Sequence, residues 1–243
     1  MKRTHNEDNL FVLQDENLYM VADGMGGHAS GEVASQMAVE TVADFYRETS
    51  RDEDVTWPYK MEKGKRFEEN RLQAGIKLAN LRIFETALQN AGQKGMGTTL
   101  VAITFSGDTA YLGHVGDSRI YRLRGDELDQ VTEDHSLLND YIKMKDLTEQ
   151  EIENFPHKNV IVRALGMKET VQVDVAHHDP EPGDLYLLCS DGLNGMITDA
   201  KIRELMIDDR NDLEKCCNEL IKAANEGGGN DNVTVVLVEI QKG

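Results

Sequence analysis

Two short segments of the chain are almost continuously apolar, and they limit what the chain can fold into. They are Leu185–Cys189 and Val233–Val238, and each has the length of one strand. Strands with this composition are buried on both faces. Turn sequences such as Ser106-Gly107-Asp108 separate other strand-like runs and predict antiparallel hairpins. Because antiparallel sheets commonly leave one face in water, burial of both faces requires two sheets packed face to face, with helices outside.

Strand-like runs and helical stripes supply the elements for such a fold. The expected strands are Leu10–Leu13, Leu18–Ala22, Thr99–Phe105, Thr109–Val115, Arg119–Leu123, Val171–Ala176, Leu185–Cys189 and Val233–Ile240. The expected helices cover residues 30–45, 72–87, 148–151 with a capping box, 200–206 capped by Asp199, and 213–224. Helices, then strands, then helices, then one strand is an order typical of the α+β class.

The length of the chain bears on its domain organisation. Its 243 residues can bury a core without disulfides or a structural metal. They could form one large domain or two small ones. No internal repeat or low-complexity linker divides the sequence, so we expect residues 1–243 to form a single domain. The charged stretch over residues 50–66 holds the sole tryptophan, Trp57, and is interpreted as an exposed connection.

The net charge of −18 argues against two classes of partner. Nucleic acids and anionic membrane surfaces both attract Lys and Arg, so we expect neither. No apolar run approaches the roughly 18 residues of a membrane span, and the N-terminal residues are too polar for a signal peptide. Cys189, Cys216 and Cys217 make a poor disulfide framework, which predicts reduced thiols in a cytoplasmic protein.

Five aspartates stand beside the predicted strands. Asp8 and Asp231 each precede a strand, whereas Asp23, Asp117 and Asp191 each follow one. In a sandwich, several such strand ends can meet at one edge. Clustered carboxylates repel one another unless cations neutralise them. Oxygen ligands select hard divalent ions such as Mg²⁺, Mn²⁺ or Ca²⁺.

Glycine follows two of these aspartates, at Gly24 and Gly192. A glycine there would let the backbone turn sharply and would leave its carbonyl open to a metal. Asp-Gly is also a common turn dipeptide with no function beyond the turn. On spacing alone, a cation site and a set of ordinary turns both stay open.

The segments around these aspartates resemble the metal-dependent protein phosphatases of type 2C in their short bacterial form. The motifs occur in the family's order and extend through nearly the whole chain. The matching segments are Arg3-Thr4-His5-Asn6-Glu7-Asp8, Val21-Ala22-Asp23-Gly24-Met25-Gly26-Gly27-His28, Gly97-Thr98-Thr99, Gly113-His114-Val115-Gly116-Asp117-Ser118-Arg119, Asp134-His135-Ser136, Arg163-Ala164-Leu165-Gly166, Leu188-Cys189-Ser190-Asp191-Gly192-Leu193 and Gly228-Gly229-Asn230-Asp231-Asn232-Val233-Thr234.

The resemblance implies a four-layer α-β-β-α sandwich, with two antiparallel sheets flanked by helices, around a centre of two Mn²⁺ or Mg²⁺ ions. By position, Asp23 corresponds to the carboxylate that bridges both metals, with the Gly24 carbonyl on one of them. Asp191 and Asp231 correspond to ligands of one ion. Asp8 corresponds to the residue that binds or orients metal-bound water.

The resemblance also implies roles around this centre. Asp117, together with Asp191, matches the pair that holds a weaker third ion in bacterial members. Arg3 matches the arginine that binds substrate phosphate, because a guanidinium can clamp two phosphate oxygens. His28 is a candidate general acid, and His5 is another because it lies near Arg3.

A segment over residues 134–160 corresponds to the family's flap, which covers the site and shapes substrate choice. His135 and Ser136 open this segment, and Ser136 would lie near the third ion.

The activity implied by the resemblance is that of a protein serine/threonine phosphatase. Phosphoserine and phosphothreonine would be hydrolysed by direct attack of a metal-bridging hydroxide. The partners would be phosphorylated proteins, the substrates of a serine/threonine kinase, and the protein is expected to be a monomer. One alternative is a pseudophosphatase that binds a partner without turnover, whose signature would be loss of the metal aspartates. Another is a phosphatase for one regulator, such as an anti-sigma antagonist.

Overall fold

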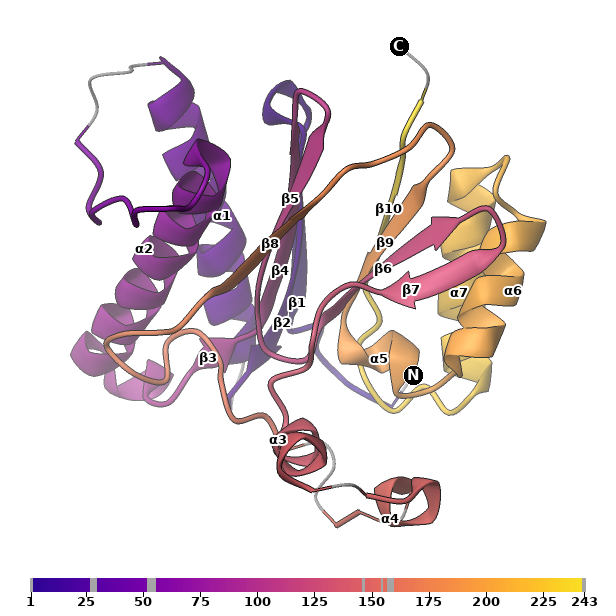
Figure 1. Cartoon of the computed structure of the whole chain (residues 1–243). Helices are drawn as coiled ribbons and strands as arrows, with labels where there is room; N and C mark the ends of the chain where they lie inside the picture. The colour runs from indigo at the N-terminus through magenta and orange to yellow at the C-terminus, as the bar shows by residue number, and fades with distance from the viewer. Residues whose placement is uncertain are drawn as a thin grey trace.

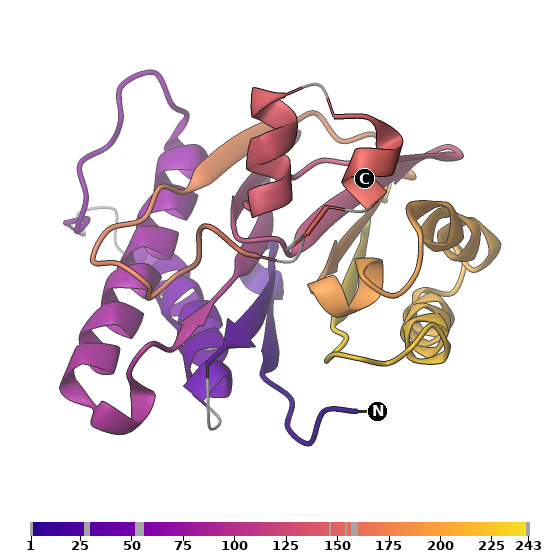
Figure 2. The same ribbon diagram turned by 90° about the horizontal axis from the view of Figure 1, so that it is seen from below.

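Two antiparallel sheets lie face to face between two pairs of helices (Figure 1). The structure is a computed structural model that describes residues 2–26, 30–51, 56–145, 147–153, 155–156 and 160–241. The view in Figure 2 shows the helix pairs on opposite sides of the sheets. The expected α+β sandwich is therefore confirmed.

The first sheet has six strands in the order β1-β2-β4-β5-β8, with β3 paired to β2. All of its pairings are antiparallel. Its strands are β1 (Asp8–Leu13), β2 (Leu18–Met25), β3 (Gly97–Thr98), β4 (Leu100–Ser106), β5 (Thr109–Val115) and β8 (Asp174–His178).

The second sheet has four strands in the order β10-β9-β6-β7. Its strands are β6 (Arg119–Arg124), β7 (Glu127–Gln130), β9 (Leu185–Cys189) and β10 (Val235–Glu239). Every residue of β9 is buried. Leu187 packs on the helix side, whereas Tyr186 and Leu188 pack between the sheets. A strand with alternate side chains on two buried faces must be apolar throughout, as the sequence predicts.

Four helices cover the outer faces of the sheets, and shorter ones lie at one end. The long helices are α1 (Ser30–Arg51) and α2 (Phe67–Gln89) on the first sheet, and α6 (Asp199–Asp208) and α7 (Leu213–Glu226) on the second. The shorter ones are α3 (Leu137–Met144), α4 (Glu149–Glu153) and α5 (Asp191–Asn194), with single turns at Gln14–Glu16 and Ala91–Gln93. In Figure 1, α3, α4, α5 and the N-terminus all lie at the lower end of the sheets.

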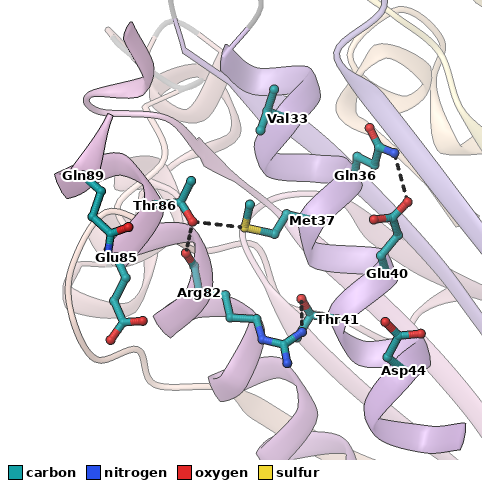
Figure 3. A pocket seen from close by; sticks show the side chains of 10 residues that line it. All are labelled: Val33, Gln36, Met37, Glu40, Thr41, Asp44, Arg82, Glu85, Thr86 and Gln89. Atoms are coloured by element: carbon teal, nitrogen blue, oxygen red, sulfur yellow. Dashed lines mark hydrogen bonds between the residues drawn. The ribbon is translucent and has the colours of Figure 1, made fainter. Parts of the chain in front are cut away.

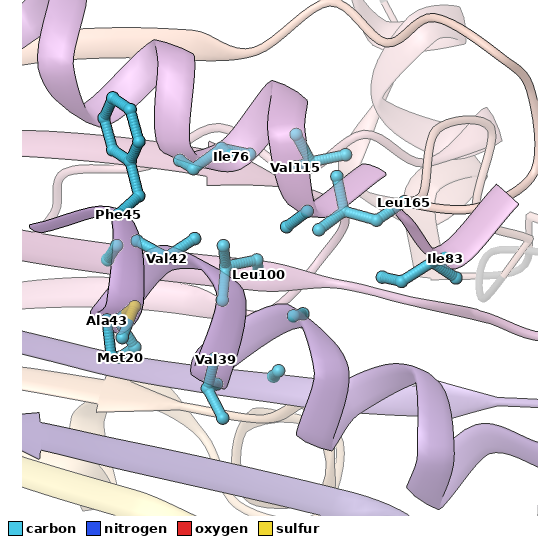
Figure 4. Packing of buried hydrophobic residues seen from close by; sticks show 14 of the residues in the cluster. Met20, Val39, Val42, Ala43, Phe45, Ile76, Ile83, Leu100, Val115 and Leu165 are labelled. Carbon is cyan, nitrogen blue, oxygen red and sulfur yellow. The ribbon is translucent and has the colours of Figure 1, made fainter. Parts of the chain in front are cut away.

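Three apolar layers separate the four structural layers. One layer lies between the first sheet and helices α1 and α2, where Val42, Phe45, Ile76 and Leu100 pack together (Figure 4). A second layer fills the space between the sheets, and a third lies under α6 and α7. Burial of this much apolar surface is the main force that holds the sheets and helices together.

Several sequence-based boundaries are wrong by a few residues. Strand β8 begins at Asp174 rather than Val171, and strand β10 begins at Val235 rather than Val233. Strands β3 and β7 were not expected. Asp199 does not cap α6, because the Thr198 side chain accepts the hydrogen bond from the Lys201 amide. The capping box at residues 148–151 is confirmed, with the Thr148 amide donating to the Glu151 carboxylate at 2.8 Å.

The stretch over residues 50–66 is only partly the exposed connection that the sequence predicts. Residues 52–55 lie outside the described residues. Trp57 is half-buried, with its ring 5.6 Å from that of Phe45 and 5.2 Å from that of Phe67. This part of the connection therefore packs on the α1–α2 layer. Among the described helices, none is long and apolar enough to cross a bilayer.

Candidate functional site

The five aspartates singled out in the sequence come together from both sheets. Asp8 and Asp23 lie directly opposite each other on β1 and β2. Asp117 follows β5 after one residue, Asp191 is the first residue of α5, and Asp231 precedes β10. Asp8, Asp117 and Asp191 each interact electrostatically with Asp23 or with one another. The carboxylates therefore form one cluster where the ends of the two sheets meet.

The Asp8 carboxylate is held by hydroxyls from the second sheet. Its Oδ2 accepts hydrogen bonds from Ser190 Oγ at 2.8 Å and from Thr234 Oγ1 at 2.7 Å. Ser190 Oγ also accepts from the Thr234 amide at 3.0 Å, which joins the end of β9 to the start of β10. Both hydroxyls lie inside the motifs quoted from the sequence, but only the structure places them on Asp8.

Holding these carboxylates ionised and close together costs free energy unless cations neutralise them. Burial raises the pKa of Asp8, and burial together with the charges of Asp8 and Asp191 raises the pKa of Asp23 well above its usual value. The pKa of Asp191 is also raised, first by burial. Carboxylates at this density need protons or positive ions to offset their repulsion.

Asp117 provides a test of whether this cluster suits a metal. Its side chain is buried, and its Oδ1 has no hydrogen-bond partner among the described residues. Burial and the negative charge of Asp191 raise the pKa of Asp117 to about 7. An unpaired buried oxygen is expensive unless a ligand satisfies it. The oxygen-only donor set and this orphaned atom fit a hard divalent cation.

The glycines after Asp23 and Asp191 serve close packing rather than the sharp turns that the sequence predicts. Gly24 lies inside β2, and a Cβ there would be 2.1 Å from the Gly31 carbonyl oxygen at the start of α1. A Cβ at Gly192 would be 1.8 Å from the Asn232 carbonyl oxygen. These close contacts let α1 approach β2, and let the segment before β10 approach α5.

A pocket of about 410 Å³ opens beside three of the aspartates. Asp117, Asp191 and Asp231 line it, as does Ser136, which caps α3. Ser136 therefore lines the same pocket as these carboxylates.

An arginine and an aspartate that sequence reasoning missed also line this pocket. Arg119 binds Asp134 through two nitrogens, with Nη2 at 2.7 Å from Oδ2 and Nε at 2.9 Å from Oδ1. Both residues lie in the quoted motifs, but nothing in their spacing reveals the pairing.

Arg3 lies at the margin of the cluster. Its Nη2 contacts Asp231 Oδ2 at 2.7 Å, and half of its side chain is exposed. Arg3, His5 and Asp231 also line an adjoining pocket of about 230 Å³. The Lys2 amide donates to the Gly229 carbonyl at 3.3 Å, which fixes this segment beside the residues before β10. His28, the other candidate general acid, lies outside the described residues.

A second groove, of about 540 Å³, lies between α1 and α2, and none of the five aspartates lines it. Figure 3 shows the side chains around it. Its acidic side chains Glu40, Asp44 and Glu85 are distributed along the two helices, and Arg82 stands among them. Gln36 Nε2 donates to Glu40 Oε1 at 2.9 Å. The pattern is typical of a solvated helix surface, since the carboxylates do not converge on one point.

Comparisons with known proteins agree with this geometry. The sequence profile described as Protein phosphatase 2C matches residues 2–236. The serine/threonine phosphatase stp of Listeria innocua is 39% identical over 251 residues, covering 99% of this chain and 94% of that protein. The structure of the S. agalactiae serine/threonine phosphatase has a TM-score of 0.86 at 35% identity, covering 99% of this chain and 96% of that one. The structure of the catalytic domain of PstP in complex with two manganese ions has a TM-score of 0.81 at 35% identity. The match covers 100% of this chain and 94% of that one.

Proposed function

The chain belongs to the protein phosphatase 2C family and is a metal-dependent protein serine/threonine phosphatase, and we propose that its five clustered aspartates form the active site. The observation that carries this proposal is the convergence of buried and half-buried carboxylates from both sheets, with one oxygen of Asp117 left unpaired among the described residues. The substrates are phosphoserine and phosphothreonine in phosphorylated proteins.

Four of the five aspartates would hold two Mn²⁺ or Mg²⁺ ions. Asp23, the most central carboxylate, would be shared by both ions, and the Gly24 carbonyl would be a further ligand. Asp191 and Asp231 would be ligands of one ion, and Asp8 would orient a water. Burial, together with the charges of neighbouring aspartates, raises the pKa of Asp8, Asp23 and Asp191, and this supports the assignments because bound cations would offset both effects.

Asp117 and Asp191 would together hold a third and weaker ion. The burial of Asp117, its unpaired Oδ1 and the adjacent 410 Å³ pocket support this position. The segment over 134–160 acts as the flap, since Ser136 and Leu138 line the same pocket.

When bound, such ions supply a nucleophilic water at neutral pH and offset the charge that builds on the phosphoryl group. The chain's own residues bind and orient. Asp8 keeps a fixed orientation because Ser190 and Thr234 both donate to its Oδ2. Arg3 binds the substrate phosphate. Among the described residues its guanidinium hydrogen-bonds only through Nη2, so other donors remain for phosphate oxygens.

The wider biology follows from the same activity. We expect the substrates to be products of a serine/threonine kinase, and we expect a cytoplasmic monomer with residues 1–243 as one catalytic domain. The three cysteines are unpaired thiols in the described part of the chain, which suits a reducing compartment. A charge of −18 disfavours nucleic acid and anionic membranes as partners. The pseudophosphatase alternative is not favoured, because all five aspartates are present.

Hydrolysis of a phosphothreonine peptide tests the proposal. We expect activity with Mn²⁺ and none with excess EDTA. Asp23→Asn and Asp191→Asn should each lower kcat by roughly 10³-fold, since metal stabilisation of the transition state is worth several kcal/mol. Titration calorimetry with Mn²⁺ should show weaker binding for both variants.

Asp208→Asn is a matched control, because Asp208 is an exposed aspartate on α6 outside the cluster. It should leave both kcat and Mn²⁺ binding unchanged. Full activity in EDTA, or unchanged turnover by Asp23→Asn, would refute the proposed site.

A further inference from the structure

His135 makes two reciprocal hydrogen bonds with one residue of the loop that carries Asp117. The His135 amide donates to the Gly116 carbonyl at 2.9 Å. In return, the Gly116 amide donates to His135 Nδ1 at 3.0 Å. His135 is buried, with 5% of its surface exposed. One residue therefore satisfies both backbone groups of the residue next to Asp117.

The imidazole of His135 is fixed in one tautomer by its neighbours. Because Nδ1 accepts a hydrogen bond, the ring proton must be on Nε2, which faces Asp174 Oδ2 at 3.0 Å. Arg163 Nη1 donates to Asp174 Oδ1 at 2.8 Å. It also lies 2.9 Å from His135 Nε2, but both of these nitrogens carry hydrogen in this tautomer, so Asp174 is the acceptor for each. The ring also stacks on His114, with centroids 4.5 Å apart and planes at 14°.

The spacing of His114, His135 and Asp174 resembles a metal site, since their ligand atoms lie within 4.8 Å of one another. The Arg163 guanidinium, however, already supplies a positive group at this position. The cluster is therefore better explained as a clamp on the His135 ring than as a second cation site.

The loop is held on the other side of Asp117 as well. Ser118 Oγ lies 2.7 Å from Thr99 Oγ1, which in turn accepts a hydrogen bond from the Asp23 amide at 3.0 Å. Asp117 Oδ1 has no partner among the described residues, so the loop is held through its neighbours, Gly116 by its backbone and Ser118 by its hydroxyl. His135 and Thr99 thus hold the two residues that flank Asp117, and Thr99 also holds Asp23.

His135 also lies where both ends of the flap come together. Its carbonyl accepts from the Val162 amide at 2.9 Å, and the Leu137 amide donates to the Val160 carbonyl at 2.8 Å. Ser136 and Ile161 form an antiparallel bridge beside these bonds. One residue therefore joins the base of the flap to the loop that carries Asp117.

We propose that His135 is a positioning residue that fixes Asp117 relative to Asp23 and couples this carboxylate to the base of the flap. The proposal rests on the proposed function only where it treats Asp117 as a metal ligand. The hydrogen-bond geometry around Gly116 stands independently of that assignment.

Two substitutions of His135 distinguish the roles of its two ring nitrogens. In His135→Asn, the amide oxygen can take the place of Nδ1 and accept from Gly116. In His135→Gln, the longer side chain reaches the Nε2 position and leaves the Gly116 amide without its acceptor. We expect amide exchange at Gly116, measured by NMR on the whole chain, to be about tenfold faster in His135→Gln and close to wild type in His135→Asn.

Mn²⁺ titration calorimetry supplies the second measurement, with Asp117→Asn as the reference. We expect the weakest Mn²⁺ site of the wild type to weaken in both His135→Gln and Asp117→Asn, and to be largely restored in His135→Asn. Asp174→Ala, at a half-exposed position, provides a test if His135→Gln does not fold. It removes the Nε2 acceptor and should give a smaller rise in Gly116 exchange.

Unchanged Gly116 exchange in His135→Gln would overturn the proposal, and so would equal behaviour of the Asn and Gln variants. A failure of the metal assignment gives a different result. Asp117→Asn would then bind Mn²⁺ as the wild type does, while Gly116 exchange would still respond to His135→Gln.

Discussion

Asp8 and Asp117 are buried, Asp23 and Asp191 beside them are half-buried, and desolvation raises the pKa of each. Their positions beside predicted strands made these residues candidates in the sequence, and the family resemblance gave them separate roles. The sequence could not identify the groups that hold them. Ser190 reaches Asp8 from 182 residues away, and a hydroxyl gives no pattern that predicts such a contact.

The titration of Asp117 predicts how the metal-free protein responds to pH. Its pKa is about 7 in the folded protein, against a usual value of 3.8. A carboxyl with a raised folded pKa stabilises the fold below its unfolded pKa, and this contribution is lost as the pH rises through the folded pKa. In EDTA, the free energy of unfolding should therefore fall by about 2 kcal/mol between roughly pH 5 and pH 8 from this group.

Urea denaturation of the wild type and of Asp117→Asn at both pH values measures this effect. The variant should lose less stability on going to high pH. Saturating Mn²⁺ should remove most of the difference in the wild type, because bound cations offset the repulsion. An equal pH slope in the two proteins would show that Asp117 does not titrate in this range.

At the scale of elements, apolar pattern predicted the buried strands best. The limits of Leu185–Cys189 and Thr109–Val115 match the structure, since both strands are bounded by turn residues and buried on both sides. Strand β7 could not be found this way. Its residues Glu127–Gln130 are mostly exposed and lack apolar alternation, and they pair with β6 only because the chain reverses at Gly125.

The connection before α2 shows a similar limit. Its many charged residues predicted an exposed segment, but Trp57 within it is half-buried. Trp57 contacts Phe45 on α1 and Phe67 at the start of α2. Trp57→Ala should lower the free energy of unfolding by about 2 kcal/mol, less than for a fully buried aromatic. Urea denaturation followed by circular dichroism would measure this loss.

Trp57→Phe, which keeps an aromatic ring, is the matched control and should retain most of the stability. The kcat of both variants on a phosphopeptide should stay within about twofold of wild type, because the packing lies on the helix side of the first sheet. An unchanged urea midpoint for Trp57→Ala would mean that the connection adds no stability.

At the scale of the whole molecule, the site depends on two sheets. The sequence predicted strands for both sheets, but it could not predict how the two sheets lie relative to each other. Asp8 and Asp23 come from the first sheet, whereas Asp191 and Asp231 come from the ends of β9 and β10 in the second. Their approach requires the close contact of Gly192 with Asn232. Local sequence pattern carries no information on such a contact, because it joins segments forty residues apart.

The charge of the whole molecule predicts a preference among substrates. Two divalent ions would offset only four of the eighteen excess negative charges, so the surface field remains negative. This field should attract phosphopeptides with Lys or Arg around the phosphoresidue and repel those with Asp or Glu. At low salt we expect kcat/KM to be about tenfold higher for the basic peptide of a matched pair.

Salt separates this long-range effect from local recognition. Raising the ionic strength to about 1 M shortens the Debye length to about 3 Å, so a preference that arises from the surface field should largely disappear. A preference that persists at high salt would instead come from direct contacts with residues near Arg3, such as His5 in the adjoining pocket. A higher kcat/KM for the acidic peptide at low salt would contradict steering by the net charge.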